Sequence, residues 1–190
     1  MSRETFDPIF YRADDALVGR LPMDCPLRET VSRLLDAVSQ ALRPGDPALA
    51  TRVTERFVGD ARRCIDASAP VLARLHDRYR LGLVSNFYRN LTAVCDDVGL
   101  SRHFDVIVDS EVVGYVKPDP RIFEAALVKL GVEADAATFV GDSLTRDMAG
   151  ARAAGMRHVW LVGDEPPTGT PCCPGDRVIR SLDELEALLP

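Results

Sequence analysis

The sequence has few aromatic residues, which make up 6% of its 190 positions, and only two lysines among its 23 basic residues. No apolar run reaches the roughly 18 to 20 residues that a membrane span needs, and the N-terminal residues lack the apolar centre of a signal peptide. It also has no basic block, because 29 acidic residues outnumber the basic ones and give a net charge of −6. We therefore expect a cytoplasmic globular protein that binds neither a membrane nor nucleic acid.

The cysteines are odd in number and show no C-x-x-C spacing, which argues against a disulfide framework and a structural zinc site. We expect reduced thiols at all five positions, which are Cys25, Cys64, Cys95, Cys172 and Cys173. The last two are adjacent and lie in a stretch rich in proline and glycine. We interpret this stretch as a plain loop, and a soft-metal or redox site is the alternative.

From about residue 70 onward, short apolar runs alternate with amphipathic stretches, a pattern that is typical of a parallel sheet covered by helices. The predicted strands are 81–84, 106–108, 138–140 and 158–162, with a short fifth strand near Val178 and Ile179. Helices are predicted to end before Gly99, Gly131 and Gly155. The length of the chain suits one domain, or one domain with a small appendage.

Two of the predicted helices also have clear start signals. Asp119 followed by Pro120 supplies an N-cap and a first-turn proline, and Ser181 with Glu184 forms a capping box for a last helix. These signals place helices between the predicted strands and at the C-terminus.

The first 70 residues have no comparable strand run. Apolar residues from Leu27 to Leu42 recur at helical spacing, and we predict further helices at about 47–67 and 70–78, with a turn at 43–46 before the first of them. The sequence therefore predicts a helical segment over residues 1–69 and an α/β unit over residues 70–190.

Polar side chains follow the predicted strands, where the binding crevice of an open α/β sheet lies. Ser85 and Asn86 follow the strand at 81–84, Lys117 lies in VGYVKPDPRIF, and Asp142 and Asp147 follow the strand that ends at Val140. A hydroxyl, a lysine and two carboxylates would together bind a phosphate group and the Mg²⁺ that neutralises it.

Taken singly, these residues have structural alternatives. Ser85 and Asn86 alone would make an ordinary strand-to-helix turn, and a lone lysine is usually solvated surface. The Gly141-Asp142-Ser143 stretch would serve as a helix cap, and Asp147 would be a first-turn acid that the helix dipole favours.

Together, the segments at 85–86, 117–120 and 141–147 resemble motifs two, three and four of the haloacid dehalogenase-like hydrolase superfamily, in the same order. The resemblance implies a three-layer α/β/α, Rossmann-like core with a parallel sheet, preceded by a helical cap-like segment. It assigns Ser85 and Lys117 to the transferred phosphoryl group, and Asn86 would line the same pocket. It assigns Asp142 and Asp147 to Mg²⁺ and implies a small phosphorylated molecule as the substrate.

The first motif of that family, a strand ending in Asp-x-Asp, has no counterpart in this sequence, so the nucleophile is unknown. The nearest candidates are Asp7 and the pair Asp14-Asp15, and neither follows a convincing strand. In the family this strand is central to the sheet. Residues Thr5–Tyr11 would fill its place, the two flanking strands would pair directly, or a partner chain would contribute. Apolar surface exposed at such a gap would favour a homodimer.

Three functions remain open at this point. In the first, the sequence is a truncated record of an active Mg²⁺-dependent phosphatase whose Asp-x-Asp strand lies upstream. In the second, it is a non-catalytic phosphate-binding or protein-interaction module on the same scaffold. The third alternative is a 2-haloacid dehalogenase, which needs no metal, and the intact Gly141-Asp142 pair favours phosphoryl chemistry over it. Tyr88 and Arg89 are expected at the surface, with the pocket as the alternative.

Overall fold

The computed structural model describes residues 2–42, 46–163 and 177–189. The chain divides into two compact units. The helical unit comprises Met1–Ala69 and Phe87–Arg102, and the sheet unit comprises Pro70–Asn86 and His103–Pro190. The predicted α/β class with a helical segment before a parallel sheet is confirmed. No local signal in the sequence, however, indicates that residues 87–102 group with the N-terminal helices.

The helical unit is built on helices that bury one apolar face each. Its core contains Leu27 and Val31, which are four residues apart on one helix face, together with Val58 and Val94 from two other helices. The unit contains α1 (Arg3–Asp15), α2 (Leu27–Leu42), most of α3 (Pro47–His76), and α4 (Leu91–Asp97), which is followed by the 3₁₀ turn η1 (Ser101–His103).

One expectation for the N-terminal part is wrong. The helices predicted at 47–67 and 70–78 are one continuous helix, α3, with Pro70 inside it. An interior proline removes a backbone hydrogen bond at a cost of about 3 kcal/mol. Packing offsets that cost, since α3 buries Val58 in the helical unit and Val71 and Leu75 in the sheet unit. The bounds of α1 were not predicted, although it lies in the segment expected to be helical; in it Phe6 and Phe10 stack at 5.8 Å between ring centroids.

The sheet unit alternates strands and helices, and every predicted strand is present within one residue at each end. Its elements are β1 (Gly82–Ser85), β2 (Val106–Asp109), α5 (Ser110–Val113), α6 (Pro120–Leu130), the 3₁₀ turn η2 (Ala134–Ala136), β3 (Thr138–Gly141), the π-helix η3 (Leu144–Met148), α7 (Ala149–Ala153), β4 (Arg157–Leu161), β5 (Arg177–Ile179), the 3₁₀ turn η4 (Leu182–Glu184), and α8 (Leu185–Leu188). The predicted start signals are also present. Asp119 caps α6 by accepting a hydrogen bond from Arg121 N, and Glu184 accepts one from Ser181 N.

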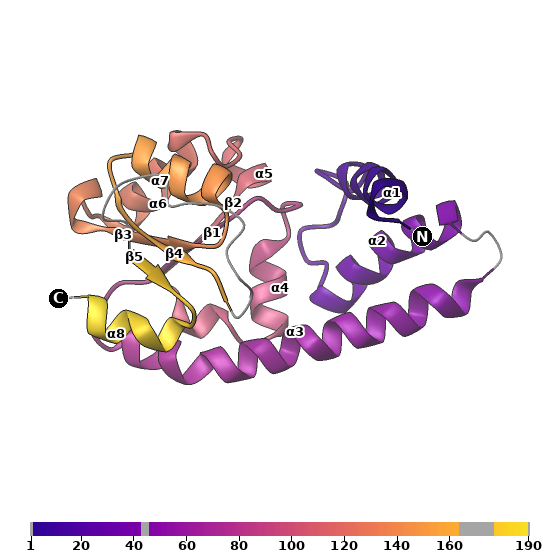
Figure 1. Cartoon of the computed structure of the whole chain (residues 1–190), viewed down its shortest axis with the longest axis horizontal. Helices are drawn as coiled ribbons and strands as arrows, with labels where there is room; N and C mark the ends of the chain where they lie inside the picture. Colours follow the sequence, from indigo (N-terminus) through magenta and orange to yellow (C-terminus); the bar gives the residue numbers. More distant parts are fainter. Residues whose placement is uncertain (1, 43–45, 164–176, 190) are drawn as a thin grey trace. The chain divides into compact units, whose positions relative to one another are not determined.

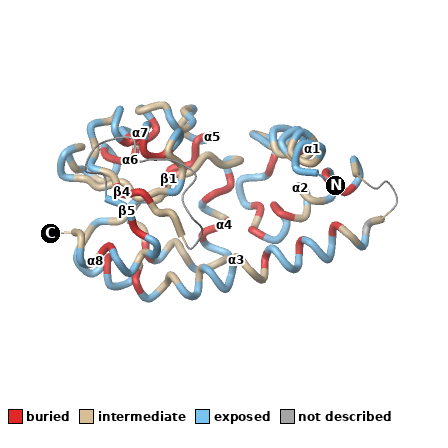
Figure 2. Tube along the Cα trace, viewed as in Figure 1, coloured by how far each residue is buried: buried red, intermediate tan, exposed pale blue. Residues whose placement is uncertain are grey.

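All strand pairs are parallel, and the helices form a layer on each side of the strands (Figure 1). On one side α6 and α7 pack on a core that includes Val84, Val108 and Phe123. On the other side the end of α3 and α8 pack on Val159 and Ile179. The buried positions lie on the strands and on the helix faces turned toward them (Figure 2).

The described strands form two separate sheets, β1-β2 and β3-β4-β5. Two of the three expected ways to fill the missing place are therefore wrong. Residues Thr5–Tyr11 belong to α1, in which Phe6 stacks on Phe10, and β1 and β3 do not pair with each other. A strand from a partner chain, and the homodimer, stay predictions.

Cys25, Cys64 and Cys95 are free thiols, as expected. The pair Cys172-Cys173 and most of the predicted turn at 43–46 lie outside the described residues. Among the helices that the structure describes, none combines the length and the apolarity needed to cross a bilayer.

Candidate functional site

The candidate site begins where β1 ends. Ser85 is the last residue of this strand, is half-buried, and donates from its hydroxyl to Asn86 O at 3.3 Å. That hydrogen bond is long and joins two residues that are adjacent in the sequence. The hydroxyl is therefore not committed to a distant partner and can turn toward a ligand at the end of the strand.

Asn86 contacts the backbone of Lys117 through both ends of its side-chain amide. Its Oδ1 accepts a hydrogen bond from Lys117 N at 2.7 Å, and its Nδ2 donates to Lys117 O at 3.1 Å. These two bonds join the end of β1 to the turn before α6, 31 residues further along the chain.

The ammonium group of Lys117 lies between the two sheets. Its Nζ is 3.3 Å from Val84 O in β1, 2.7 Å from Asp147 Oδ1, and 5.7 Å from the centroid of the Phe139 ring in β3. The Lys117 side chain is 15% exposed. A lysine in this position is a fixed positive charge at the carboxyl ends of β1 and β3, and it is not the solvated surface residue of the structural alternative.

Asp147 is held in the π-helix that follows β3, and its side chain is 5% exposed. Its Oδ2 accepts a hydrogen bond from Ser143 N at 3.0 Å. Its Oδ1 is buried without a hydrogen bond within the described residues, because Lys117 Nζ stands at ion-pair distance but in poor hydrogen-bond geometry. This oxygen keeps the capacity to take a further cationic ligand.

Gly141 allows the Asp147 carboxylate to lie against the end of β3. A Cβ at residue 141 would lie 2.6 Å from Asp147 Oδ2 and 2.7 Å from its Cγ, closer than real Cβ contacts. The predicted interpretation of Gly141-Asp142-Ser143 as a simple helix cap is incomplete. Ser143 does cap η3 through Arg146 N, but the glycine also makes room for a buried acid.

Asp142 directly follows β3 and is exposed. Its backbone oxygen accepts a hydrogen bond from Trp160 Nε1 at 2.9 Å, so the main chain at this point is fixed while the carboxylate faces solvent. The site thus pairs one buried acid, Asp147, with one accessible acid, and both come from the same strand-to-helix connection.

This donor set fits Mg²⁺ bound together with a phosphate. No three His, Cys, Asp or Glu side chains cluster as a complete metal cage in the described ranges. Mg²⁺ does not need such a cage, since it is commonly held by one or two carboxylates plus waters and substrate phosphate oxygens. The buried, unbonded Oδ1 of Asp147 and the exposed carboxylate of Asp142 supply that minimum.

The expected nucleophile candidates lie in the helical unit. Asp7 is in α1, 3.7 Å from Arg3 Nε, and Asp14, also in α1, accepts a hydrogen bond from the Tyr88 hydroxyl. Neither residue follows a strand within the described ranges. Burial, with the Asp14 hydrogen bond and charge adding to it, raises the pKa of Tyr88, so this half-buried phenol stays neutral. Arg89 is exposed, as expected.

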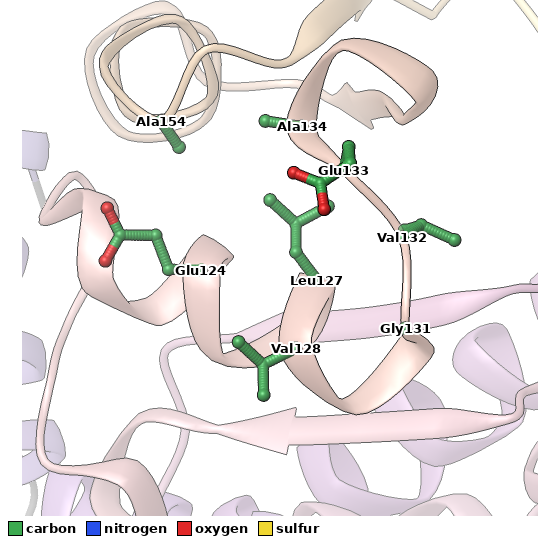
Figure 3. Close-up of a pocket in the computed structure, with 8 residues that line it drawn as sticks. All are labelled: Glu124, Leu127, Val128, Gly131, Val132, Glu133, Ala134 and Ala154. Atoms are coloured by element: carbon green, nitrogen blue, oxygen red, sulfur yellow. The ribbon is translucent and has the colours of Figure 1, made fainter.

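One pocket, with a volume of about 310 Å³, lies elsewhere in the sheet unit (Figure 3). It is lined by the C-terminal part of α6, the connection to η2, and Ala154. None of the five candidate site residues lines it. It faces the amino end of β3, opposite the strand ends where ligands bind in open α/β sheets.

Sequence reasoning missed two features of the site. One is the backbone contact of Asn86 with Lys117, for which a separation of 31 residues leaves no local signal. The other is the Val84 carbonyl as a partner of the lysine. The need for Gly141 was readable in principle, since a glycine in a strand often marks the close approach of another group to the backbone.

Comparisons with known proteins agree with this geometry. A family model described as haloacid dehalogenase-like hydrolase matches residues 13–155. Haloacid dehalogenase-like hydrolase domain-containing protein 3 of Bos taurus is 43% identical over 108 residues, which is 56% of this chain and 43% of that protein. Phosphoserine phosphatase of Thermus thermophilus is 35% identical over 169 residues, covering 86% of this chain and 66% of that protein. The chain thus spans less than half the length of the first of these two relatives.

Solved structures show the same fold. A haloacid dehalogenase-type hydrolase of Bacillus subtilis, crystallised with magnesium, has a TM-score of 0.65 and 26% identity, over 98% of this chain and 80% of that one. A phosphatase from Thermococcus onnurineus has a TM-score of 0.61 and 25% identity, over 84% and 87%. A 2-haloacid dehalogenase from Pseudomonas syringae has a TM-score of 0.59 and 25% identity, over 100% and 81%.

Proposed function

The chain belongs to the haloacid dehalogenase-like hydrolase family, and from that premise we propose that its sheet unit binds a small phosphorylated molecule with Mg²⁺ and serves phosphate-ester hydrolysis. The observation that carries the proposal is the fixed ammonium of Lys117, 2.7 Å from the buried acid Asp147 at the ends of two parallel strands. Relatives named phosphoserine phosphatase and phosphoglycolate phosphatase support the same class of reaction.

Each side chain has a distinct part in the proposal. Lys117 and the Ser85 hydroxyl donate to the phosphoryl oxygens, and Asp142 and Asp147 hold the metal. Mg²⁺ in such a site neutralises phosphoryl charge and orients the group. Because Lys117 is mostly buried, its charge acts in a medium less polarisable than water and favours an anion strongly.

The chain's own residues account for binding and orientation in this proposal but not for the attack on phosphorus. Covalent phosphoryl transfer in this family uses an Asp-x-Asp strand, and the printed sequence contains no Asp-x-Asp. A binding group cannot replace a positioned nucleophile. Turnover therefore requires a carboxylate from outside the residues assigned here, and without it the chain acts as a phosphate-binding module.

The second candidate function is dehalogenation of a small 2-halo acid. The structural likeness to the 2-haloacid dehalogenase of Pseudomonas syringae, which extends over the whole chain, favours it. The acid pair Asp142 and Asp147 argues for phosphoryl chemistry instead, because hydrolysis of a carbon–halogen bond needs no metal.

The test is hydrolysis of p-nitrophenyl phosphate and, separately, binding of inorganic phosphate, each with and without Mg²⁺. We expect phosphate binding that depends on Mg²⁺, is weakened in Lys117→Ala and is lost in Asp142→Asn. Matched controls are Lys129→Ala, which removes the other, exposed lysine, and Asp135→Asn, which removes an exposed acid remote from the strand ends.

Each outcome separates the candidates. Turnover that the Lys117 and Asp142 variants abolish supports a phosphatase. Binding without turnover supports the phosphate-binding module. Halide release from a 2-chloro acid without any effect of Mg²⁺ supports the dehalogenase. Phosphate binding that the control variants weaken as much as Lys117→Ala would contradict the proposed site.

A further inference from the structure

We infer that Asn86 is a positioning residue for Lys117, acting on the phosphoryl group only through the lysine. The inference rests on the proposed function, because it explains how this chain places the ammonium that the proposal uses. It departs from the sequence-based expectation, in which Asn86 lines the phosphate pocket in its own right.

The geometry of the amide carries the argument. Asn86 Oδ1 accepts from Lys117 N at 2.7 Å while its Nδ2 donates to Lys117 O at 3.1 Å, so one planar group bonds both polar atoms of one backbone residue. Two bonds from a rigid amide fix the orientation of that residue as well as its position. An asparagine facing a ligand would instead direct at least one end of the amide away from the protein backbone.

The turn that carries Lys117 is also fixed on its other side. Asp119 N donates to Val116 O at 2.9 Å, and the Asp119 side chain caps α6. The lysine therefore stands between the first turn of α6 and the end of β1, and Asn86 is the link to β1. This link fixes the backbone position of Lys117, from which the side chain extends so that Nζ contacts Val84 O and Asp147.

An asparagine is suited to this role by its hydrogen-bonding groups. Its amide offers a donor and an acceptor at one end of a short side chain, whereas aspartate lacks the donor and serine lacks the reach of a planar fork. One N–H and one lone pair of Asn86 remain beyond the two bonds. Direct contact with phosphate is thus a distinct alternative, which an experiment can separate from positioning.

The first experiment measures the chemical reactivity of the Lys117 ammonium group in the absence of any ligand. The chain has two lysines, so acetylation by a water-soluble acetyl ester followed by mass spectrometry gives one rate for Lys117 and one for the exposed Lys129. In the unaltered protein we expect Lys117 to react more slowly than Lys129. In Asn86→Ala the Lys117 rate should rise about tenfold, the equivalent of one net hydrogen bond, while the Lys129 rate stays constant.

Asn86→Asp provides a second variant that keeps the acceptor for Lys117 N and loses the donor to Lys117 O. The acetylation rate of Lys117 in Asn86→Asp should lie between the rate in the unaltered protein and the rate in Asn86→Ala. Fluorescence of Trp160 during urea unfolding shows that each variant is folded when tested. An unchanged Lys117 rate in folded Asn86→Ala overturns the inference, whether or not the protein binds phosphate.

The second experiment separates positioning from contact. Affinity for inorganic phosphate with Mg²⁺ is measured for Asn86→Ala, Lys117→Ala and the double variant. Positioning predicts a loss of about tenfold for Asn86→Ala alone and no further loss when Lys117 is already alanine. A further loss of about tenfold in that background would show direct contact and overturn the inference. If the unaltered protein binds no phosphate, the proposed function fails, and the acetylation rates still decide the role of Asn86.

Discussion

Asp147→Asn should strongly destabilise the protein, because it breaks the ion pair between Lys117 and Asp147 with almost no change in shape. The two charged atoms are 2.7 Å apart, and the side chains are 15% and 5% exposed. At an effective dielectric constant of about 20 their attraction is about 6 kcal/mol. Removal from water costs several kcal/mol for each ion, so the net contribution of the intact pair is small.

Breaking the pair is a different matter, because Asp147→Asn leaves a mostly buried ammonium without its counter-charge. Loss of one partner of a buried pair costs about 3–5 kcal/mol. We expect the lower end, since Val84 O still accepts from Lys117 Nζ and the lysine keeps some contact with solvent. The double variant Lys117→Met/Asp147→Asn carries no unpaired charge and should lose less, below about 2 kcal/mol.

Urea unfolding followed by the fluorescence of Trp160 measures both variants. This is the one tryptophan of the sequence, it is buried, and its ring nitrogen bonds to Asp142 O beside the pair. Lys129→Met is the control and should change stability by no more than about 0.5 kcal/mol. The reasoning is refuted if Asp147→Asn costs less than about 1 kcal/mol, or if the double variant is destabilised as much as Asp147→Asn alone.

Three further predictions concern Gly141, Asp119 and the proposed metal ligand Asp142. Gly141→Ala should destabilise the protein by about 1–3 kcal/mol in urea unfolding and weaken phosphate binding, because the new Cβ would overlap the Asp147 carboxylate; an equally stable variant with full binding would contradict the packing argument. Hydrogen bonds from Arg121, first from its side chain and then from its backbone N–H, lower the pKa of Asp119 to about 2. Its contribution to stability should therefore be present above pH about 4 and disappear as the pH falls toward 2, which NMR titration of the carboxyl would test; a midpoint near 4 would refute it. Mg²⁺ at about ten times its Kd should stabilise the chain by about 1.4 kcal/mol in thermal unfolding, and Asp142→Asn should abolish that shift; a shift retained in the variant would exclude Asp142 as a ligand.

The sheet unit was predictable from the sequence because local signals and tertiary packing agree there. Each strand contains a short apolar run, and α6 has both an N-cap at Asp119 and a left-handed glycine, Gly131, at its end. The N-terminal helices were harder, since Pro8 in α1 and Pro70 in α3 weaken the local helix signal. The apolar residues of α3 stabilise this helix through packing that periodicity alone does not reveal.

The candidate site was predictable as a set of positions but not as a set of contacts. Residue type and place at a strand end point to Ser85, Lys117, Asp142 and Asp147. The partners of these side chains depend on how β1, β3 and the turn before α6 meet in space. The sequence could not indicate that the side-chain amide of Asn86 forms hydrogen bonds with the Lys117 backbone, because the two residues are 31 positions apart.

The interruption of the sheet between β1 and β3 bears differently on the two parts of the proposed function, which are ligand binding and turnover. Among the described residues β1 pairs only with β2, and β3 pairs only with β4, so the place between them is taken by no strand of this structure. Lys117 nevertheless reaches Val84 O on one side and Asp147 on the other. The groups proposed for phosphate and Mg²⁺ are thus held by β1, by the turn before α6 and by the connection after β3. Binding of phosphate and Mg²⁺ can therefore be tested with these residues alone, whereas the proposed hydrolysis requires a further carboxylate.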